Sequence, residues 1–300
     1  MKQNILIIGS EGFIGSHLVT HFNKAHQVYG IDLLGSPTQV YRYWQNSRSN
    51  NILETCFKET QFNVCINAAG SGNAGYSMQH PLSDFELNVL QTQHVLDIIR
   101  GFQPDCKYLH FSSAAVYGNP RHLPVQETDM IDPLSPYGWH KYMAENLCTE
   151  YNKIYSVPTA ILRPFSVYGP GLKKQLFWDL YQKIKGNESR IELWGTGKET
   201  RDFIYIKDLC YCIDLIMQKS EFASTVYNIG VGEETTILRA ATALGALLNP
   251  GIKIEFNKQA KPGDPQNWKA DISKITSLGF TPKFGFDEGI LNIANWIQTQ

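Results

Sequence analysis

A tyrosine and a lysine stand four residues apart in the stretch SPYGWHK, residues 135–141. Side chains four apart share one face of a helix, so the Lys141 ammonium can lie near the Tyr137 ring and lower the pKa of its phenol from the usual value of about 10. Ser135 and Pro136 suit the cap and the first position of such a helix, which places Tyr137 near the positive end of the helix dipole. The pair therefore predicts a phenol that can act as a base near neutral pH.

The same spacing is also common on the solvent face of amphipathic helices, so a second feature has to support a catalytic interpretation. Ser112 and Ser113 provide one, because they end the strand-like run KYLHFSS at residues 107–113. Open α/β sheets hold their ligands at the carboxyl ends of the strands. The two serines are therefore expected at the edge of the sheet where a ligand binds.

Three glycines, Gly9, Gly12 and Gly15, follow a strand-like run and open a helix-like run at the start of the chain. Gly9 allows a tight turn, Gly12 lets a pyrophosphate approach the backbone, and Gly15 lets the helix pack close to the strand. The unpaired N–H groups and the positive dipole end of that helix can then bind phosphate oxygens. This context predicts a dinucleotide site.

Asp32 ends the second apolar run, 20 residues beyond Gly12. Its carboxylate can accept hydrogen bonds from the adenosine ribose hydroxyls, and it would repel a 2′-phosphate. Leu33 and Leu34 follow at positions where an arginine could accommodate that phosphate. The sequence therefore favours NAD over NADP, although Asp32 could also be a simple turn former at the end of a strand.

Short apolar runs alternate with helical patterns through much of the chain, which is typical of βαβ units. Strands are predicted at residues 4–9, 27–32, 62–70, 107–113 and 159–164. Long helices are predicted at about 81–102 and about 136–155. This order predicts an α/β fold with a doubly wound, mostly parallel Rossmann sheet that is covered on both faces.

The regular alternation ends after the sequence Gly-Pro-Gly at residues 169–171, where Gly, Pro and aromatic residues become more frequent. We expect a smaller C-terminal α/β lobe to begin there. The predicted NAD-binding domain comprises residues 1–168 plus about 202–242. The predicted substrate lobe comprises about 169–201 plus 243–300.

The composition argues against several classes of protein. The 27 basic and 28 acidic residues give a formal net charge of −1, which provides no strong field to attract nucleic acid or an anionic membrane surface. The early apolar run at residues 5–8 is too short for a membrane span or a signal peptide, which predicts a soluble, cytoplasmic protein. The six cysteines form no CxxC pair, and His17 and His21 have no obvious third ligand, so neither a disulfide framework nor a metal site is predicted.

These motifs together resemble those of the extended short-chain dehydrogenase/reductases of the nucleotide-sugar epimerase and dehydratase family. The resemblance extends over essentially all 300 residues. The matching pieces are GSEGFIG, INAAGSGNAGYS, FSSAAVYG, SPYGWHK, RPFSVYGPG, LWGTGKETRDFIYIKDL, YNIGVG and KPGDPQNWKADISKITSLGF.

The resemblance implies a Ser/Tyr/Lys active site. Tyr137 would exchange a proton with a sugar oxygen, Ser113 would hydrogen-bond the same oxygen, and Lys141 would bind the nicotinamide ribose and tune the phenol. The residues implied to bind NAD are Gly9, Gly12, Phe13, Ile14, Gly15, Asp32, Leu33, Ala68, Ala69, Gly70, Asn88, Ser112, Tyr137, Lys141 and Pro164. The residues implied to bind a nucleotide-diphosphate sugar are Ser113, Tyr137, Ser166, Arg201 and Lys261.

The chain departs from its relatives at positions that bear on the reaction. Dehydratases of the family carry an acidic pair directly after the position of Ser113, whereas this chain has Ala114 and Ala115 there. A methyl group cannot transfer protons, so a 4,6-dehydratase is improbable. Ser166 replaces an asparagine that is frequent in UDP-sugar enzymes, and Lys261 replaces a diphosphate-binding arginine. Gly72 stands where some UDP-hexose epimerases have a lysine. These changes put UDP specificity in doubt.

The leading hypothesis is an NAD-dependent nucleotide-sugar epimerase of polysaccharide biosynthesis that works through a keto-sugar intermediate. The alternative is an NAD(P)H-dependent reductase of nucleotide 4-keto-6-deoxysugars, which would use the same residues once. A third hypothesis is an inactive NAD-sensing or scaffold protein that keeps the fold. We also expect a homodimer formed through the helices at 81–102 and 136–155, the second of which carries Met143, Leu147 and Tyr151 on one stripe.

Overall fold

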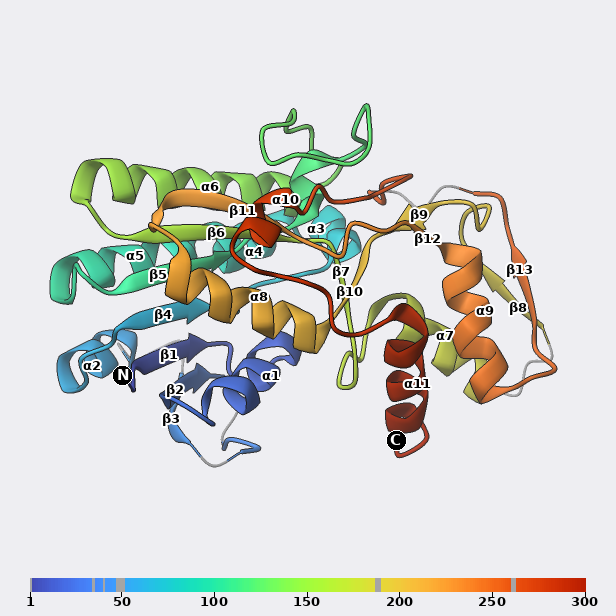
Figure 1. Cartoon of the computed structure of the whole chain (residues 1–300), viewed down its shortest axis with the longest axis horizontal. Coiled ribbons are helices and arrows are strands. Elements are labelled where there is room, and N and C mark those ends of the chain that lie inside the picture. Colours follow the sequence, from blue (N-terminus) through green and yellow to red (C-terminus); the bar gives the residue numbers. More distant parts are fainter. Residues whose placement is uncertain (1, 34–35, 40, 47–51, 187–189, 260–262) are drawn as a thin grey trace.

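The computed structural model describes residues 2–33, 36–39, 41–46, 52–186, 190–259 and 263–300. Within these residues, one sheet has seven strands in the order β11-β6-β5-β4-β1-β2-β3, and all neighbouring pairs are parallel (Figure 1). The strands are β1 (Asn4–Ile8), β2 (Gln27–Asp32), β3 (Arg42–Gln45), β4 (Val64–Asn67), β5 (Lys107–Phe111), β6 (Thr159–Pro164) and β11 (Ala223–Ile229). The predicted Rossmann sheet is confirmed.

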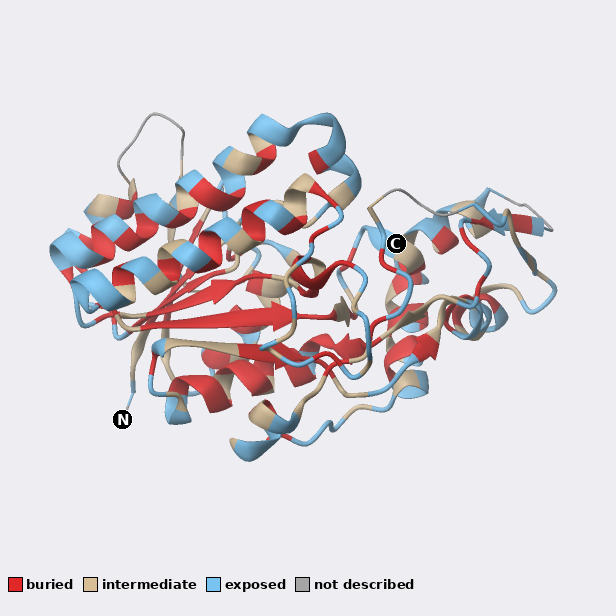
Figure 2. Cartoon of the chain, turned by 90° about the horizontal axis from the view of Figure 1, so that it is seen from above, coloured by how far each residue is buried: buried red, intermediate tan, exposed pale blue. Residues whose placement is uncertain are grey.

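Side chains alternate between the two faces of the sheet, as the pleat requires. In β1, Leu6 and Ile8 belong to the apolar cluster under α2, α5 and α6, while Ile5 and Ile7 belong to the cluster under α1 and α8. Because both faces are covered, the central strands are red almost throughout in the burial view (Figure 2), whereas the edge strands β3 and β11 are less buried. The covering helices are α1 (Phe13–Phe22), α2 (Ile52–Glu59), α5 (Gln91–Phe102), α6 (Pro136–Tyr155) and α8 (Ile206–Lys219).

The strand order reverses between β1 and β4, where the chain turns first to one side of β1 and then to the other. Open parallel sheets bind their ligands at this switch point, outside the carboxyl ends of the strands. The loops that follow β1, β4 and β5 therefore surround the position expected for a ligand. Short helical segments lie along this edge: α3 (Ala74–Gln79), α4 (Pro81–Phe85), the π-helical turn η1 (Glu86–Leu90) and the 3₁₀ turn η2 (Ala114–Tyr117).

A smaller lobe extends beyond this edge (Figure 1). It contains α7 (Gln175–Lys185), α9 (Ile237–Leu248) and α11 (Phe286–Ile297), with α9 packed against the other two. Its short strands pair as β7 (Ser166–Tyr168) with β10 (Phe203–Tyr205), β8 (Arg190–Leu193) with β13 (Lys253–Phe256), and β9 (Thr200–Arg201) with β12 (Thr235–Thr236). The helix α10 (Ser273–Ser277) packs against β11.

Tyr168 joins the lobe to the sheet, because its ring contacts Phe177, Phe203, Tyr205 and Phe286 within one continuous apolar cluster. The predicted division into two domains stays a prediction. Its boundary near residue 242 falls inside α9.

Three local details differ from the sequence prediction. The long helix predicted at about 81–102 consists of α4, the π-helical turn η1 and α5. The strand β3 and the helix α2 were not predicted. None of the helices in the part of the chain that the structure describes is long and apolar enough to cross a membrane.

Candidate active site

The first βα turn is built so tightly that its glycines cannot be replaced without a collision. Gly9 has φ +79°, and a Cβ there would lie 2.8 Å from the backbone nitrogen of Ala69. A Cβ on Gly15 would lie 2.0 Å from the carbonyl oxygen of Gly9. Gly12 is the N-cap of α1 and has no side chain that could satisfy the first N–H groups of the helix, so these groups can receive a phosphate.

The end of β2 lies directly beside this turn. The Asp32 carboxylate accepts hydrogen bonds from the backbone N–H groups of Glu11 (2.9 Å) and Leu33 (2.7 Å). The Glu11 carboxylate accepts from the backbone N–H and the hydroxyl of Thr38 at 2.9 and 2.6 Å, and from the Tyr41 hydroxyl. Two carboxylates thus lie where the adenosine ribose is expected, and sequence analysis had recognised only Asp32.

The loop after β4 forms the other side of the switch point. Ala68 donates its N–H to the Ile8 carbonyl at 2.9 Å, and Gly70 has φ +119°. A Cβ on Gly70 would lie 2.7 Å from Oδ1 of Asn88, a buried oxygen that has no hydrogen-bond partner in the structure. An acceptor that finds no donor among the described residues, together with the backbone of the glycine turn, fits a dinucleotide, because a bound ligand can supply a donor.

Three more predicted NAD-binding residues lie along the same edge of the sheet. Phe13 and Ile14 begin α1, immediately after the glycine turn. Pro164 ends β6. All three residues therefore lie on the side of the sheet where the cofactor is predicted to bind.

Ser113, Tyr137 and Lys141 lie together at the carboxyl end of β5. The Ser113 side chain is near enough to the Tyr137 phenol to act as a hydrogen-bonding neighbour that influences its pKa, and the Ser113 oxygen accepts from the backbone N–H of Ala115 at 3.1 Å. The Lys141 Nζ lies 5.9 Å from the centre of the Tyr137 ring and donates to the Phe111 carbonyl at 2.8 Å. The predicted helix cap is also present, since the Ser135 hydroxyl accepts from the Gly138 N–H at 3.3 Å.

The predicted lowering of the phenol pKa is wrong for this structure. Burial raises the pKa of Tyr137 to about 12; the hydrogen bond from Ser113 counteracts this in part, and the charge of Asp84 adds to it. Lys141 does not offset the rise because its ammonium points to the Phe111 carbonyl and is itself buried, which lowers the pKa of Lys141 to about 8. The tyrosine therefore holds its proton at neutral pH in this state.

A buried pair that sequence analysis missed lies behind the tyrosine. His140 Nδ1 is 2.7 Å from Oδ2 of Asp84, whose side chain is completely buried. The second oxygen of Asp84 has no hydrogen-bond partner in the structure. Ser77 completes the support, since its hydroxyl accepts from the backbone N–H of Tyr137 at 3.0 Å.

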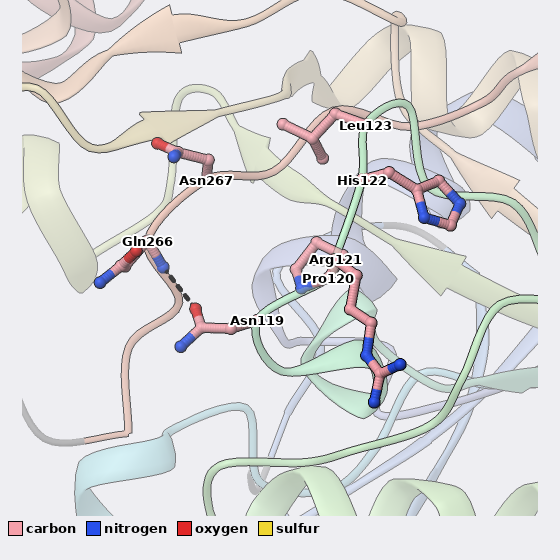
Figure 3. A pocket seen from close by; sticks show the side chains of 7 residues that line it. All are labelled: Asn119, Pro120, Arg121, His122, Leu123, Gln266 and Asn267. Carbon is pink, nitrogen blue, oxygen red and sulfur yellow. Dashed lines mark hydrogen bonds between the residues drawn. The ribbon is translucent and has the colours of Figure 1, made fainter.

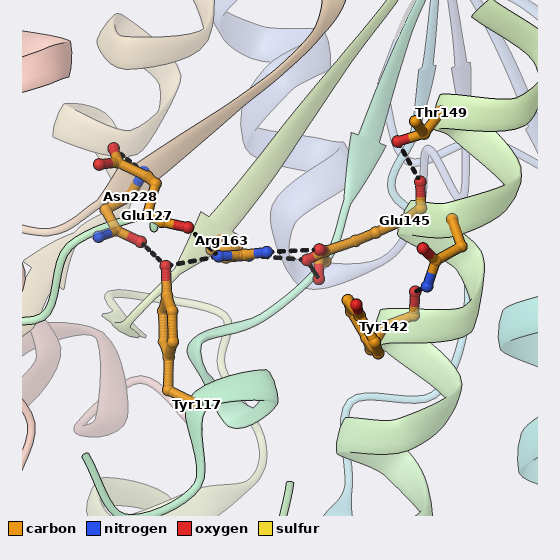
Figure 4. A network of polar contacts seen from close by, with 9 residues as sticks. Tyr117, Glu127, Tyr142, Glu145, Thr149, Arg163 and Asn228 are labelled. Atoms are coloured by element: carbon orange, nitrogen blue, oxygen red, sulfur yellow. Dashed lines mark hydrogen bonds and ion pairs between the residues drawn. The ribbon is translucent and has the colours of Figure 1, made fainter. Parts of the chain in front are cut away.

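Ser112 contacts a buried polar network that includes Glu145, Arg163 and Tyr117, and Figure 4 shows these three residues. Its hydroxyl donates to Oε1 of Glu145 at 2.5 Å, and Glu145 forms two charge-assisted hydrogen bonds with Arg163 at 2.9 and 2.7 Å. Arg163 also donates to the Tyr117 hydroxyl at 2.8 Å, which in turn donates to Asn228 at 2.7 Å. The network fixes β5, β6, α6 and β11 relative to one another, so Ser112 has a structural role in addition to its predicted contact with NAD.

The predicted substrate residues lie farther along the cleft, on the side of the smaller lobe. The backbone N–H of Ser166 donates to the Asp202 carbonyl at 2.9 Å. Ser166 therefore lies beside the residue that follows Arg201 in the chain. The Arg201 guanidinium donates to the Thr200 and Gln266 carbonyls at 2.8 and 3.2 Å. Lys261 lies outside the described residues.

A pocket of about 300 Å³ adjoins Arg201 (Figure 3). Gln266 belongs to its wall and donates its N–H to Oδ1 of Asn119 at 2.7 Å. The lining residues are Asn119, Pro120, Arg121, His122, Leu123, Gln266 and Asn267. None of the Ser/Tyr/Lys residues lines this pocket, so it is separate from the predicted position of the reacting sugar.

Metal ligation has no comparable basis among the residues described. No group of three or more His, Cys, Asp or Glu side chains there is placed to hold an ion. His17 instead interacts through Nε2 with the Pro170 carbonyl at 2.9 Å. The six cysteines are all buried and unbridged.

The parallel sheet, the glycine turn and the acidic end of β2 define the class as a dinucleotide-binding enzyme with the architecture of an extended short-chain dehydrogenase/reductase. The sequence profile of the NAD-dependent epimerase/dehydratase family matches residues 5–230. The chain belongs to this family. It is accordingly an NAD-dependent enzyme.

Known proteins resemble the chain over its full length. A Methanocaldococcus jannaschii protein provisionally named UDP-glucose 4-epimerase is 30% identical over 306 aligned residues, which cover 98% of each chain. The UDP-glucuronic acid 4-epimerase of Bacillus cereus, solved with UDP-glucuronic acid and NAD, has 28% identity and a TM-score of 0.89 over 99% of each chain. The UDP-N-acetylglucosamine 4-epimerase of Methanobrevibacter ruminantium M1, solved with UDP-N-acetylmuramic acid, has 25% identity and a TM-score of 0.90 over 100% of each chain.

Proposed function

We propose that the protein is an NAD-dependent nucleotide-sugar epimerase. The observation that carries the proposal is the convergence of three side chains at the carboxyl end of β5. Ser113 adjoins the Tyr137 phenol, and the Lys141 ammonium lies 5.9 Å from the centre of the Tyr137 ring and beside the loop of Gly70. A sugar hydroxyl bound there would meet a proton-transferring phenol and a second hydroxyl at the same oxygen.

Tyr137, Ser113 and Lys141 would act on one carbon of the sugar, first in its oxidation and then in its reduction. Bound NAD supplies a hydride acceptor that can later return the hydride. Tyr137 would take the proton of the ring hydroxyl when the sugar is oxidised and give it back when the keto sugar is reduced from its other face. Ser113 would hold the oxygen in place, and Lys141 would bind the nicotinamide ribose and add positive charge near the phenol. The raised pKa of Tyr137 suits the proton-donating half of this cycle.

The positions after Ser113 support epimerisation over dehydration. Ala114 is completely buried, and Ala115 contributes only its backbone N–H, which donates to Ser113 at 3.1 Å. Elimination of water needs a proton donor and a base on neighbouring carbons, and neither alanine side chain can supply one.

The relatives support a nucleotide-diphosphate sugar as the substrate, because the similar solved structures include 4-epimerases with UDP-sugars bound. Within this chain, Arg201 and Lys261 are the cations that we assign to the diphosphate, and Ser166 is assigned to the sugar or its nucleotide.

We further propose a homodimer formed through two neighbouring helical segments. Leu82, Leu87 and Leu90 are exposed on α4 and η1, and Trp139 and Met143 are exposed on α6, which packs beside both. A second copy could cover this apolar face by forming a four-helix bundle. The predicted stripe on α6 is only partly available: Met143 is exposed, whereas Tyr151 is buried and Leu147 packs against the core. A cytoplasmic location and a role in polysaccharide biosynthesis remain predictions.

The function can be tested by incubating the purified protein with NAD and a set of nucleotide hexoses, and by identifying the products by NMR. The proposal predicts interconversion of two epimers without net formation of NADH. Oxidation of NADH or NADPH with a nucleotide 4-keto-6-deoxysugar, without interconversion of any epimer pair, would instead identify a reductase. Tight NAD binding without either reaction would favour an inactive sensor or scaffold.

A further inference from the structure

The segment that joins β7 to α7 crosses the open edge of the sheet. Its Pro170 carbonyl lies 2.9 Å from Nε2 of His17 on α1, and a Cβ on Gly171 would lie 3.7 Å from the Phe13 ring. Gly171 adopts φ +95°, which lets the backbone turn at this point of close approach. The segment therefore passes directly over the start of α1, which follows the glycine turn.

Lys174 ends this segment as the N-cap of α7 and extends its ammonium to the loop after β4. Its Nζ lies 3.2 Å from the position that a Cβ on Gly72 would occupy. A larger residue at position 72 would thus meet the ammonium.

A second ammonium approaches the same loop from α6. The Lys141 Nζ lies 3.6 Å from the position of a Cβ on Gly70, and the charge of Lys174 contributes to the lowered pKa of Lys141. Residue 174 is exposed, and partial desolvation of its ammonium lowers the pKa of Lys174. Two like charges thus converge on residues 70–72, an arrangement that an anion would stabilise.

The nearby carboxylates do not neutralise Lys174. Asp84 is paired with His140, and Glu145 is paired with Arg163. Within the described ranges, the Lys174 ammonium forms no hydrogen bond or ion pair of its own. Lys174 therefore brings an ammonium without a partner among the described residues to the loop beside the predicted position of the sugar.

We propose that Lys174, which extends from the start of α7 to the loop of Gly72, binds an anionic oxygen of the nucleotide sugar. The anion is a carboxylate on the sugar or an oxygen of the diphosphate, which share the same chemistry toward an ammonium. This inference rests on the proposed class of substrate. It does not rest on the epimerase reaction.

The test is equilibrium binding to the NAD-saturated protein, measured by isothermal titration calorimetry with UDP-glucuronic acid, UDP-glucose and UDP as separate probes. Lys174→Met should weaken binding of UDP-glucuronic acid about tenfold or more, as expected when a charge-assisted hydrogen bond is lost. Lys173→Met is the matched control, because the Lys173 ammonium lies over the Trp178 ring at 5.8 Å from its centre. The control should bind all three probes with wild-type affinity, and Lys174→Arg should retain most of the affinity.

The pattern across the probes identifies the anion. A loss confined to UDP-glucuronic acid indicates the sugar carboxylate, and an equal loss for all three probes indicates the diphosphate. Wild-type affinity of Lys174→Met for every probe would overturn the proposal, as would a loss of the same size in Lys173→Met. Because the readout is binding, a protein that binds these probes but interconverts no epimers would refute the proposed function and leave the role of Lys174 standing.

Discussion

Substitution of Arg163 by methionine should destabilise the protein strongly, because it leaves the Glu145 carboxylate buried without its cation. The side chains of both residues are only 5% exposed, and two hydrogen bonds of 2.9 and 2.7 Å join them. Removal of one partner of such a buried pair typically costs about 3–5 kcal/mol. With an unfolding entropy of about 2.1 cal/mol/K per residue, a chain of 300 residues should lose roughly 5–8 °C in Tm.

The assay is thermal unfolding followed by circular dichroism, with two variants for comparison. Arg100→Met breaks the surface pair between Arg100 and Asp97, whose side chains are 43% and 54% exposed, and should lower Tm far less because solvent screens this pair. The double variant Arg163→Met/Glu145→Leu removes both charges and should recover much of the stability lost in the single variant. If Arg163→Met lowers Tm no more than Arg100→Met does, the stabilising role assigned to the network is wrong.

Three further predictions concern the cofactor turn, the buried lysine and the apolar face. Gly15→Ala should lower the free energy of unfolding by about 1–3 kcal/mol and weaken NAD binding measured by calorimetry, because the new Cβ would lie 2.0 Å from the Gly9 oxygen. The control Gly101→Ala should change neither quantity, because no atom lies within 4 Å of the position of its Cβ. The pKa of Lys141 falls from 10.5 to about 8 on folding, so the native protein loses this proton at a lower pH than the unfolded chain does. Between pH 8 and 10.5 the free energy of unfolding of the wild type should therefore rise by about 3 kcal/mol relative to that of Lys141→Met. A difference in urea unfolding that does not change with pH would contradict this. Leu90→Asp should give monomers in analytical ultracentrifugation. Leu291→Asp is the control and should leave the dimer intact, because Leu291 is similarly exposed but lies on α11. Unchanged dimers of Leu90→Asp, or a monomeric wild-type protein, would refute the proposed dimer face.

Features with a local physical cause could be predicted from the sequence. The buried strands read as apolar runs, and the glycine turn and the cap of α6 follow from the short-range geometry of Gly9 and Ser135. Strand β3 was missed because its four residues lie at the edge of the sheet and none of them is fully buried, so they carry no apolar period. Helix α2 was missed because its eight residues bury only Leu53, Cys56 and Phe57.

The electrostatics of the site could not be predicted, because they depend on contacts between distant parts of the chain. The spacing of Tyr137 and Lys141 suggested a lowered phenol pKa, but the fold buries both groups and directs the ammonium to the Phe111 carbonyl. In the same way, the proximity of Lys174 to Gly72 arises only when the segment after β7 crosses the sheet edge. A sequence pattern identifies the reactive groups but does not determine how far each is desolvated.

The most direct test of the proposed function is the rate at which Tyr137→Phe interconverts the nucleotide sugar, measured with NAD and substrate both saturating. The Phe variant removes one oxygen and retains the ring, so NAD affinity and Tm should stay close to those of the wild-type protein. The rate should fall by about 10²–10⁴-fold, the usual contribution of a general acid–base group. A folded, NAD-bound Tyr137→Phe protein that turns over within a few-fold of the wild-type rate would show that another group transfers the proton.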